Sequence, residues 1–207
     1  MRNQKILQSG FSLVEVLVAI TILLLVIVGP MQILSRSINS TNFATEQVNA
    51  WFLAQEGLEL AQKGRDDLVL ADFKDVISGG SGVEPAPFTT FMTRYTNCLI
   101  DINPDGCGLE IGNGDSAPIT VVSCGVVSNC RLYVTTTANT DRSSYQHSGS
   151  GNSISPYTRV IKMERSPASG NVREIKVTST VTWRTGSLIS SQKVEAVTYL
   201  FNVYDTN

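Results

Sequence analysis

The sequence contains few of the residues on which most enzyme active sites and nucleic-acid interfaces depend. His147 is the only histidine among 207 residues, and it lies in the polar stretch DRSSYQHSGSGNS. Such a stretch is typical of a surface loop, so we expect His147 to be a loop residue and not a catalytic base. The 16 Lys and Arg residues are outnumbered by 18 Asp and Glu residues, and no run of five basic residues occurs. With a net charge of -2, the chain is not expected to have nucleic acid as its main partner.

The glycine-rich stretches lack the features of a phosphate-binding loop. SGGSG and GSGN have neither the G-K-[ST] ending nor the preceding strand that such a loop requires. No pair of carboxylates can be assigned to acid–base catalysis from the sequence, and we predict that the protein is not an enzyme. The Ser- and Thr-rich segments leave an adhesive or glycan-binding role as an alternative, although no aromatic cluster indicates one.

A long apolar run is present near the amino terminus. From Phe11 to Val28 only Ser12, Glu15 and Thr21 interrupt eighteen residues, which is about the minimum for a membrane-spanning helix. The preceding leader, MRNQKILQSG, carries two cations that favour a cytoplasmic amino terminus and an outward-facing remainder. Since GPMQILSRSINS, which follows the run, lacks an A-x-A cleavage pattern, we expect the run to be kept in the mature protein.

Glu15 is unusual within this run, because a carboxylate in a membrane span costs a few kcal/mol and usually marks a function. The stretch GFSLVE, from Gly10 to Glu15, resembles the prepilin signal of type IV pilins and type II secretion pseudopilins. The resemblance implies that prepilin peptidase cuts between Gly10 and Phe11 and that Phe11 is then N-methylated. It also implies that Glu15, as the fifth mature residue, pairs with the amino-terminal nitrogen of a neighbouring subunit inside a filament.

A buried carboxylate is tolerated in a low dielectric only when it meets a cation and hydrogen-bond donors, which makes this role reasonable. Phe11 and Glu15 are also spaced i and i+4, so a contact within one helix is the competing possibility before assembly. A membrane-anchored surface protein or adhesin that keeps its leader is the alternative of another class.

The apolar run is followed by a second helical pattern. Gly29 and Pro30 are expected to loosen or kink the helix. Helical spacing then resumes and predicts a continuation to Lys63, ended by Gly64, about 78 Å in all for residues 12–63. The predicted apolar stripe, with Phe52 as a further packing residue, consists of Ala44, Val48, Trp51, Ala54, Leu58 and Ala61. AQEGLELAQKGRD, within this region, resembles a segment of PilV-like minor pilins.

The remainder predicts a globular head. DDLVLADFKDVI, over residues 66–77, favours another short helix, and SGGSGVEPAP favours a loop. Strands are predicted in APITVVSC, CRLYVTTT, YTRVIKMER, NVREIKVTSTVTWR and GSLISSQKVEAVTYLFNV, with turns near residues 166–170 and 185–187. The last three should form an antiparallel meander, and its apolar face should cover the helix. In the middle strand this face consists of the alternate residues Ile175, Val177, Ser179, Val181 and Trp183.

The expected fold class is therefore α+β, with a long amino-terminal helix packed on an antiparallel sheet, as the family resemblance also implies. The expected divisions are a cleaved leader (1–10), a membrane or filament-core helix (11–30), its amphipathic continuation (31–64) and the head (65–207).

Four cysteines, Cys98, Cys107, Cys124 and Cys130, all fall in the head. An even number in an extracytoplasmic region predicts disulfides, and the lack of any C-x-x-C spacing argues against zinc. Three connectivities are possible; the local pairs Cys98–Cys107 and Cys124–Cys130 are favoured as nearby crosslinks in loop-rich segments. Free buried thiols are the alternative.

The stretch DINPDG resembles the first half of an EF-hand-type calcium loop, with oxygen-bearing Asp101, Asn103 and Asp105 at alternate positions. The closing glutamate is missing, although Glu110 and Asp115 are near enough in sequence to substitute. An ordinary turn is the simpler interpretation. Any calcium here would be structural, and no other cofactor is expected.

The sequence thus favours a minor type IV pilin, with a pseudopilin of a secretion or competence system as the alternative. The resemblance implies prepilin peptidase, other pilin subunits, a pilus assembly platform and, before assembly, membrane lipid as partners. We expect a single-pass membrane precursor that becomes part of an extracellular filament.

Overall fold

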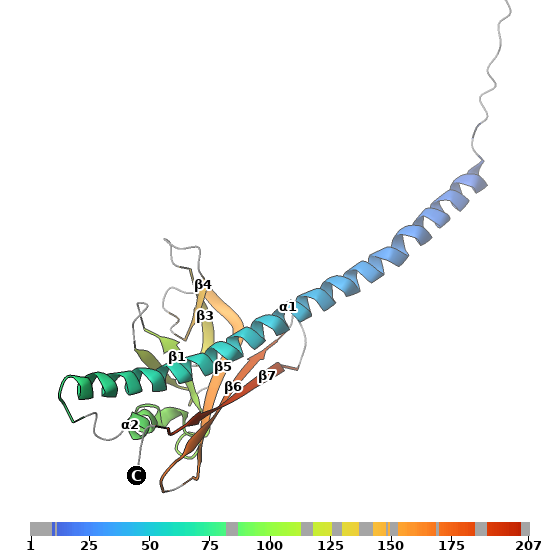
Figure 1. The fold of residues 1–207 in the computed structure, drawn as a ribbon. Coiled ribbons are helices and arrows are strands. Elements are labelled where there is room, and N and C mark those ends of the chain that lie inside the picture. The colour runs from blue at the N-terminus through green and yellow to red at the C-terminus, as the bar shows by residue number, and fades with distance from the viewer. Residues whose placement is uncertain are drawn as a thin grey trace, which may run out of the picture. The chain divides into compact units, whose positions relative to one another are not determined.

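A computed structural model describes residues 10, 12–81, 87–112, 118–125, 130–136, 143–147, 149, 153–168, 170–184 and 190–203 (Figure 1). The chain divides into two compact units, residues 1–45 and residues 46–207. The first unit consists, where described, mainly of helix, and the second holds the rest of that helix and a β-sheet. From here on, the head means residues 46–207, which include the end of α1 as well as the predicted head of residues 65–207.

One helix, α1 (Leu13–Ile77), covers nearly all of the two predicted helical segments, residues 12–63 and 66–77. Helical structure is continuous through Gly29 and Pro30, so the predicted loosening does not end the helix there. The helix also continues past Gly64, so the predicted end at this residue was wrong. Residues 66–77 are helical, as predicted, but they belong to the same helix. Gly64 is buried, and a Cβ atom at this position would overlap the Tyr95 side chain. The glycine therefore permits close packing and does not terminate the helix.

The sheet has seven strands, in agreement with the α+β prediction. They are β1 (Cys107–Ile111), β2 (Ile119–Ser123), β3 (Arg131–Thr136), β4 (Ser143–Gln146), β5 (Ser153–Ser166), β6 (Glu174–Trp183) and β7 (Gln192–Phe201). All their pairings are antiparallel: β2-β1-β5-β3-β4 form one path, while β6 pairs with β5 and β7 (Figure 1).

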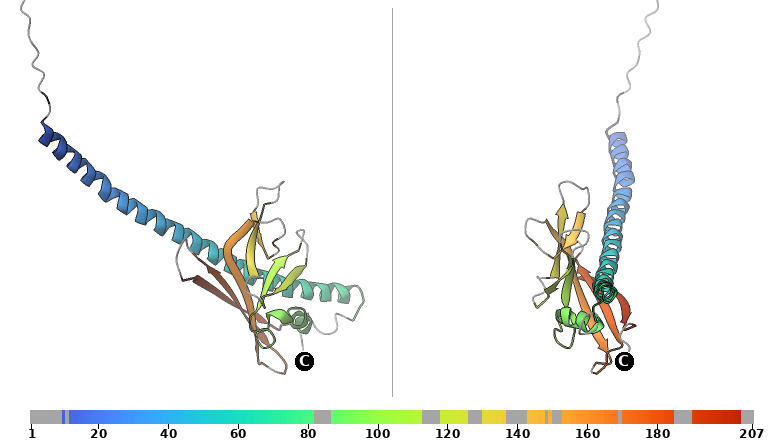
Figure 2. Two further views of the ribbon diagram at one scale, coloured as in Figure 1. Left: turned by 180° about the vertical axis from the view of Figure 1, so that it is seen from behind. Right: turned by 60° about the vertical axis from the view of Figure 1, so that its left-hand side comes forward.

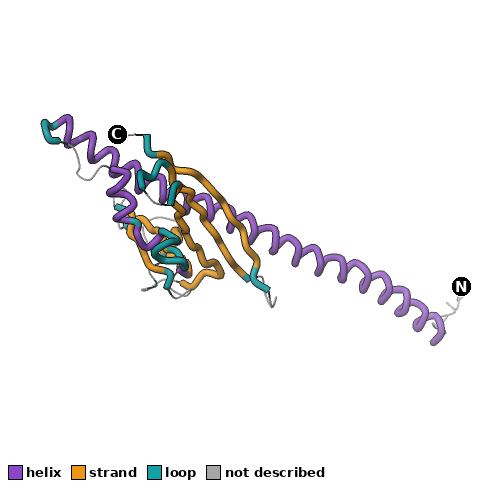
Figure 3. Tube along the Cα trace, turned by 90° about the horizontal axis from the view of Figure 1, so that it is seen from below, coloured by secondary structure: helices purple, strands orange, loops and turns teal. Residues whose placement is uncertain are grey.

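The predicted meander is formed by the three longest strands, β5, β6 and β7. Ile175, Val177, Ser179, Val181 and Trp183 are all buried on β6, which confirms the predicted alternation. The head part of α1 lies against this face of the sheet, so helix and sheet form two layers (Figures 2 and 3).

The predicted apolar stripe of α1 was right in its second half, where Ala54 and Ala61 are buried and Leu58 packs against the core, and wrong in its first half. Ala44 and Val48 are exposed, and so are the larger Trp51 (43% exposed) and Phe52 (65% exposed). The buried residues of α1 are mostly small, namely Ala50, Leu53, Ala54, Gly57, Leu60, Ala61, Gly64 and Val69. A helix that approaches a sheet closely needs small side chains at the contact, whereas hydrophobicity alone selects the largest ones.

Gly57 lies where α1 packs directly against the sheet. A Cβ atom at this position would lie 2.5 Å from Ser179 Oγ and 2.7 Å from Ile161 Cδ1. Both contacts are shorter than van der Waals separation, so a side chain here would push helix and sheet apart.

Several short elements of the head were not predicted. They include β1, β4, the helix α2 (Pro87–Arg94) and the 3-10 turn η1 (Thr96–Cys98). In α2 and just after it, Phe88, Phe91 and Tyr95 pack together in the main hydrophobic cluster, with ring centroids of Phe91 and Tyr95 4.5 Å apart. Burial raises the pKa of Tyr95 to about 12. These aromatic residues close one end of the core beside Gly64.

Candidate functional site

The amino-terminal segment carries the predicted processing and assembly residues. Gly10 is exposed, Phe11 lies outside the described residues, and α1 begins at Leu13. Glu15 is exposed in the first turn of α1, where the helix dipole favours a negative charge. The Val16 N–H donates to the Ser12 carbonyl oxygen at 3.2 Å, which adds the backbone of Ser12 to this turn.

Every described residue from 12 to 42 is exposed in the single chain. The run includes many large apolar side chains, among them Leu13, Val14, Leu17, Ile22, Leu23, Leu24, Leu25, Val26, Ile27, Met31, Ile33 and Leu34. In α1 the structure has a helix that is long and apolar enough to cross a membrane. So large an unpartnered apolar surface requires lipid or other protein to cover it.

Glu15 is the only charged residue between positions 12 and 35. Whatever covers the apolar run therefore also surrounds one carboxylate. Because Phe11 is not among the described residues, the contact between its amine and Glu15 stays a prediction, within one chain or between two.

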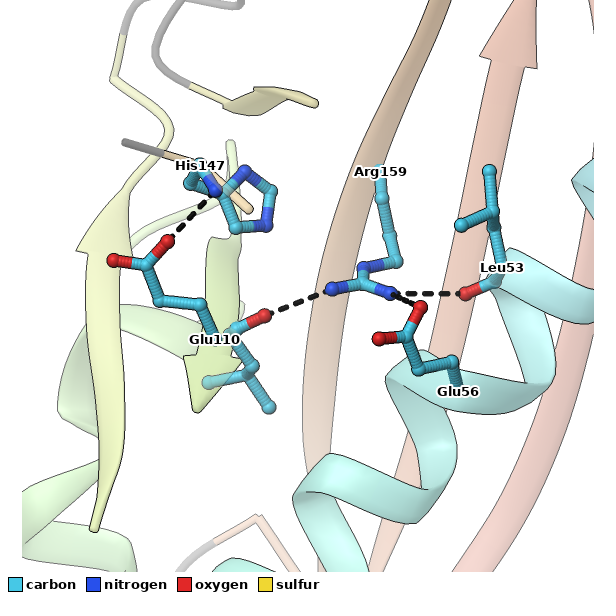
Figure 4. Close-up of polar contacts among 6 residues, drawn as sticks. Leu53, Glu56, Glu110, His147 and Arg159 are labelled. Carbon is cyan, nitrogen blue, oxygen red and sulfur yellow. Dashed lines mark hydrogen bonds and ion pairs between the residues drawn. The ribbon is translucent and has the colours of Figure 1, made fainter. Parts of the chain in front are cut away.

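Arg159 is the main polar contact between helix and sheet inside the head. Its side chain is 0% exposed, and its Nη1 donates to Glu56 Oε2 at 2.8 Å and to the Leu53 carbonyl oxygen at 3.2 Å (Figure 4). Nη2 donates to the Leu109 carbonyl oxygen at 2.9 Å. One guanidinium thus joins α1, β5 and β1. Burial lowers the pKa of Arg159, and the Glu56 carboxylate opposes that shift.

Sequence reasoning missed Arg159, although a signal for it was present. In YTRVIKMER, Arg159 lies two residues from Tyr157 and from Ile161, so it shares their face of the strand. Both of these residues face the core. Alternation along a strand places a residue on a face regardless of its charge. A charged residue on the apolar face predicts a partner of opposite charge beside it, which here is Glu56 on α1.

The prediction that His147 is a surface-loop residue was wrong. Its side chain is only 6% exposed and packs closely over Gly108, where a Cβ atom would lie 2.7 Å from His147 Nε2. Its backbone N–H donates to Glu110 Oε2 at 2.7 Å (Figure 4). Burial, with a smaller contribution from Arg159, lowers the pKa of His147 to about 4. The surrounding sequence is polar and therefore does not indicate that His147 is buried. The ring fits into the core because Gly108 on β1 has no side chain.

The cysteines form the disulfides Cys98–Cys107 and Cys124–Cys130. These are the two local pairs that their spacing favoured. The first links η1 to the start of β1, and the second joins the residue after β2 to the residue before β3. All four cysteines are buried, so the crosslinks belong to the interior of the head.

The DINPDG segment forms a turn. Asn103 Nδ2 donates to the carbonyl oxygens of Asn97 at 2.8 Å and Gly106 at 2.7 Å, and Gly106 has a positive φ of 79°. The Asp101 carboxylate pairs with Arg165. Within the described ranges no group of three His, Cys, Asp or Glu residues could hold a metal ion. Asp115 lies outside those ranges, so calcium binding through Asp101, Asn103 and Asp105 stays a prediction.

Comparison with known proteins adds one finding. Residues 7–29 match the family model described as the prokaryotic N-terminal methylation motif. No curated protein and no solved structure matches the chain significantly. The matched segment includes Gly10, Phe11 and Glu15 and most of the exposed apolar run.

Proposed function

We propose that this chain, whose methylation motif and α+β fold support the type IV pilin and pseudopilin family, is a minor pilin. It is a structural subunit that enters or initiates a filament after removal of its leader. The observation that carries the proposal is the combination of the motif at residues 7–29 with an apolar helix that begins at Leu13 and is exposed through the rest of the motif.

In this account the precursor is held in the membrane by α1, with its amino terminus in the cytoplasm and its head outside. Prepilin peptidase cuts between Gly10 and Phe11, and Phe11 is methylated on its new amine. The apolar part of α1 then exchanges lipid for the helices of other subunits as the assembly platform builds the filament. This exchange keeps the apolar surface out of water at each step.

Glu15 has a specific role in this exchange. Its carboxylate enters an apolar environment and needs a cation, and the amine of Phe11 becomes available only after cleavage. Pairing with the amine of an adjacent subunit sets the axial register, because a subunit in another register leaves the buried charge unpaired. The head supplies surface contacts or a role at the filament tip.

A pseudopilin of a secretion or competence system is the second candidate, because the methylation motif and the exposed apolar helix fit both kinds of filament. We prefer a minor to a major pilin because the amino-acid sequence of the predicted head is long and irregular.

The Glu15→Ala variant tests the role of the carboxylate. In cells that assemble the native filament, we expect its leader to be cleaved and the subunit to be absent from sheared filaments. Thr21→Ala is a matched control: it also removes a polar group from the exposed run, but Thr21 Oγ1 already donates to the Val18 carbonyl oxygen at 2.8 Å. We expect this control to be cleaved and incorporated. Normal incorporation of Glu15→Ala would remove the register role and leave the cleavage prediction standing.

A further inference from the structure

A hollow of about 730 Å³ lies at one end of the outer face of the sheet, the face opposite α1. Its base is a row across three strands, since Arg131 on β3 pairs with Thr158 on β5, which pairs with Thr182 on β6. Paired residues of antiparallel strands point to the same face. Their neighbours toward α1, such as Leu132 and Val181, are buried, which places the row on the outer side.

Two arginines give this hollow a positive charge. Arg131 lies in the row, and Arg184 follows the last residue of β6. Both are exposed, and within the described part of the chain neither has an ion-pair partner. No Asp or Glu is among the described residues that line the hollow.

A second hollow on the same face shows that this charge pattern is not general. It has a volume of about 470 Å³ and is lined by both cations and anions, including Lys162, Glu164, Lys193 and Glu195. Lys193 pairs there with Glu195 at 3.1 Å. An anion would meet repulsion as well as attraction in that hollow, whereas the charged groups among the described lining residues of the hollow at Arg131 and Arg184 are both cations.

The remaining lining residues restrict the kind of anion. Thr158, Thr182 and Ser191 supply hydroxyl groups, and Ile154 and Pro156 supply an exposed apolar surface. Hydroxyl groups both donate and accept hydrogen bonds, as the hydroxyls of a sugar do. Trp183, the one aromatic residue among the described lining residues, has its side chain buried among the core residues.

We propose that this hollow binds an acidic saccharide, in which carboxylate or sulfate groups meet Arg131 and Arg184. Guanidinium groups form paired, charge-assisted hydrogen bonds with such oxyanions. The hydroxyls of Thr158 and Thr182 bind sugar hydroxyls, and the C–H face of the ring lies on Ile154 and Pro156. A nucleic acid fits less well because single-stranded binding sites rely on exposed aromatic rings for base stacking.

The proposal goes beyond the filament role and does not depend on leader cleavage. It adds a ligand to the head, which a subunit at a filament surface or tip would expose to acidic polysaccharides.

Calorimetric titration of the full-length protein in lipid nanodiscs tests it. The probes are trigalacturonate, which carries carboxylates, and a κ-carrageenan tetrasaccharide, which carries sulfates. The neutral methyl ester of trigalacturonate and a short oligothymidylate serve as comparisons. We expect at least one acidic saccharide to bind more tightly than both, with an affinity that falls as NaCl rises from roughly 50 to 200 mM. The better acidic probe identifies which oxyanion the site prefers.

Arg131→Gln and Arg184→Gln should each weaken binding by about tenfold, as expected for the loss of a hydrogen bond to a charged group. Arg173→Gln is the matched control, because Arg173 is exposed near the opposite end of β6 and should bind like the natural chain. Equal effects of all three substitutions, no binding of either acidic saccharide, or tighter binding of oligothymidylate would each overturn the proposal.

Discussion

The two units of this chain differ in where they place apolar surface: the first unit exposes it and the head buries it. In the first unit, described residues up to position 42 are exposed, and from Leu13 to Leu34 that surface is apolar apart from Glu15, Thr21 and Gln32. In the head, the same helix buries small residues, and a fully buried arginine joins it to the sheet. A single helix thus carries an incomplete interface in one half and a complete one in the other. Substitutions in the first half should affect assembly, and substitutions in the second half should affect stability.

Substitutions of glycine in the two halves of α1 should show the largest difference in the stability of the head. In Gly57→Val the new side chain overlaps Ser179 and Ile161, so we expect a loss of about 3 kcal/mol in the free energy of unfolding of the head. Gly29→Ala is the control in the other half of α1, because nothing lies within 4 Å of a Cβ atom there. It should leave head stability unchanged. Urea denaturation of the full chain in micelles measures both, and equal midpoints for the two variants would contradict the packing account.

The ion pair at Arg159 should have the next largest effect. Glu56→Ala leaves a buried guanidinium without its carboxylate, and we expect a loss of about 2 kcal/mol. This is less than for a fully buried pair, because the Glu56 side chain is 41% exposed. The same denaturation experiment on Glu56→Ala/Arg159→Met should show a smaller loss, since the double variant removes the unpaired charge. A double variant less stable than Glu56→Ala would show that packing of Arg159 matters more than its charge.

His147 should give an effect of comparable size, but only at low pH. Its pKa is lowered to about 4 in the folded head, so the unfolded chain, with an ordinary histidine pKa near 6.5, binds the proton more readily. The contribution is complete above about pH 6.5 and is lost as the pH falls toward 4, by about 2 kcal/mol at pH 5. Denaturation midpoints between pH 7 and pH 5 measure it. His147→Gln should reduce the slope, and an unchanged slope would assign it to the carboxylates.

The first half of α1 could be predicted from the sequence more fully than the head could. GFSLVE and its apolar run could be recognised because their signal is local, and the alternation in β6 predicted its buried face. The prediction that Trp51 is buried was wrong because close packing of a helix on a sheet selects small residues. A prediction from hydrophobic periodicity gives more weight to large apolar residues.

The misses in the head have a common physical cause. His147 is buried because Gly108, 39 positions earlier in the chain, leaves space for its ring. Gly64 lies inside a helix instead of ending it, because the Tyr95 side chain occupies the space that a side chain at position 64 would need. Both depend on contacts between residues far apart in the sequence, which local patterns do not contain.

The most direct test of the account is mass spectrometry of the protein purified from its native membrane. We predict an amino terminus that begins at Phe11 and carries a methyl group on its nitrogen. A protein that retains the leader from Met1 to Gly10 would contradict the filament-subunit account and would favour an anchored surface protein instead.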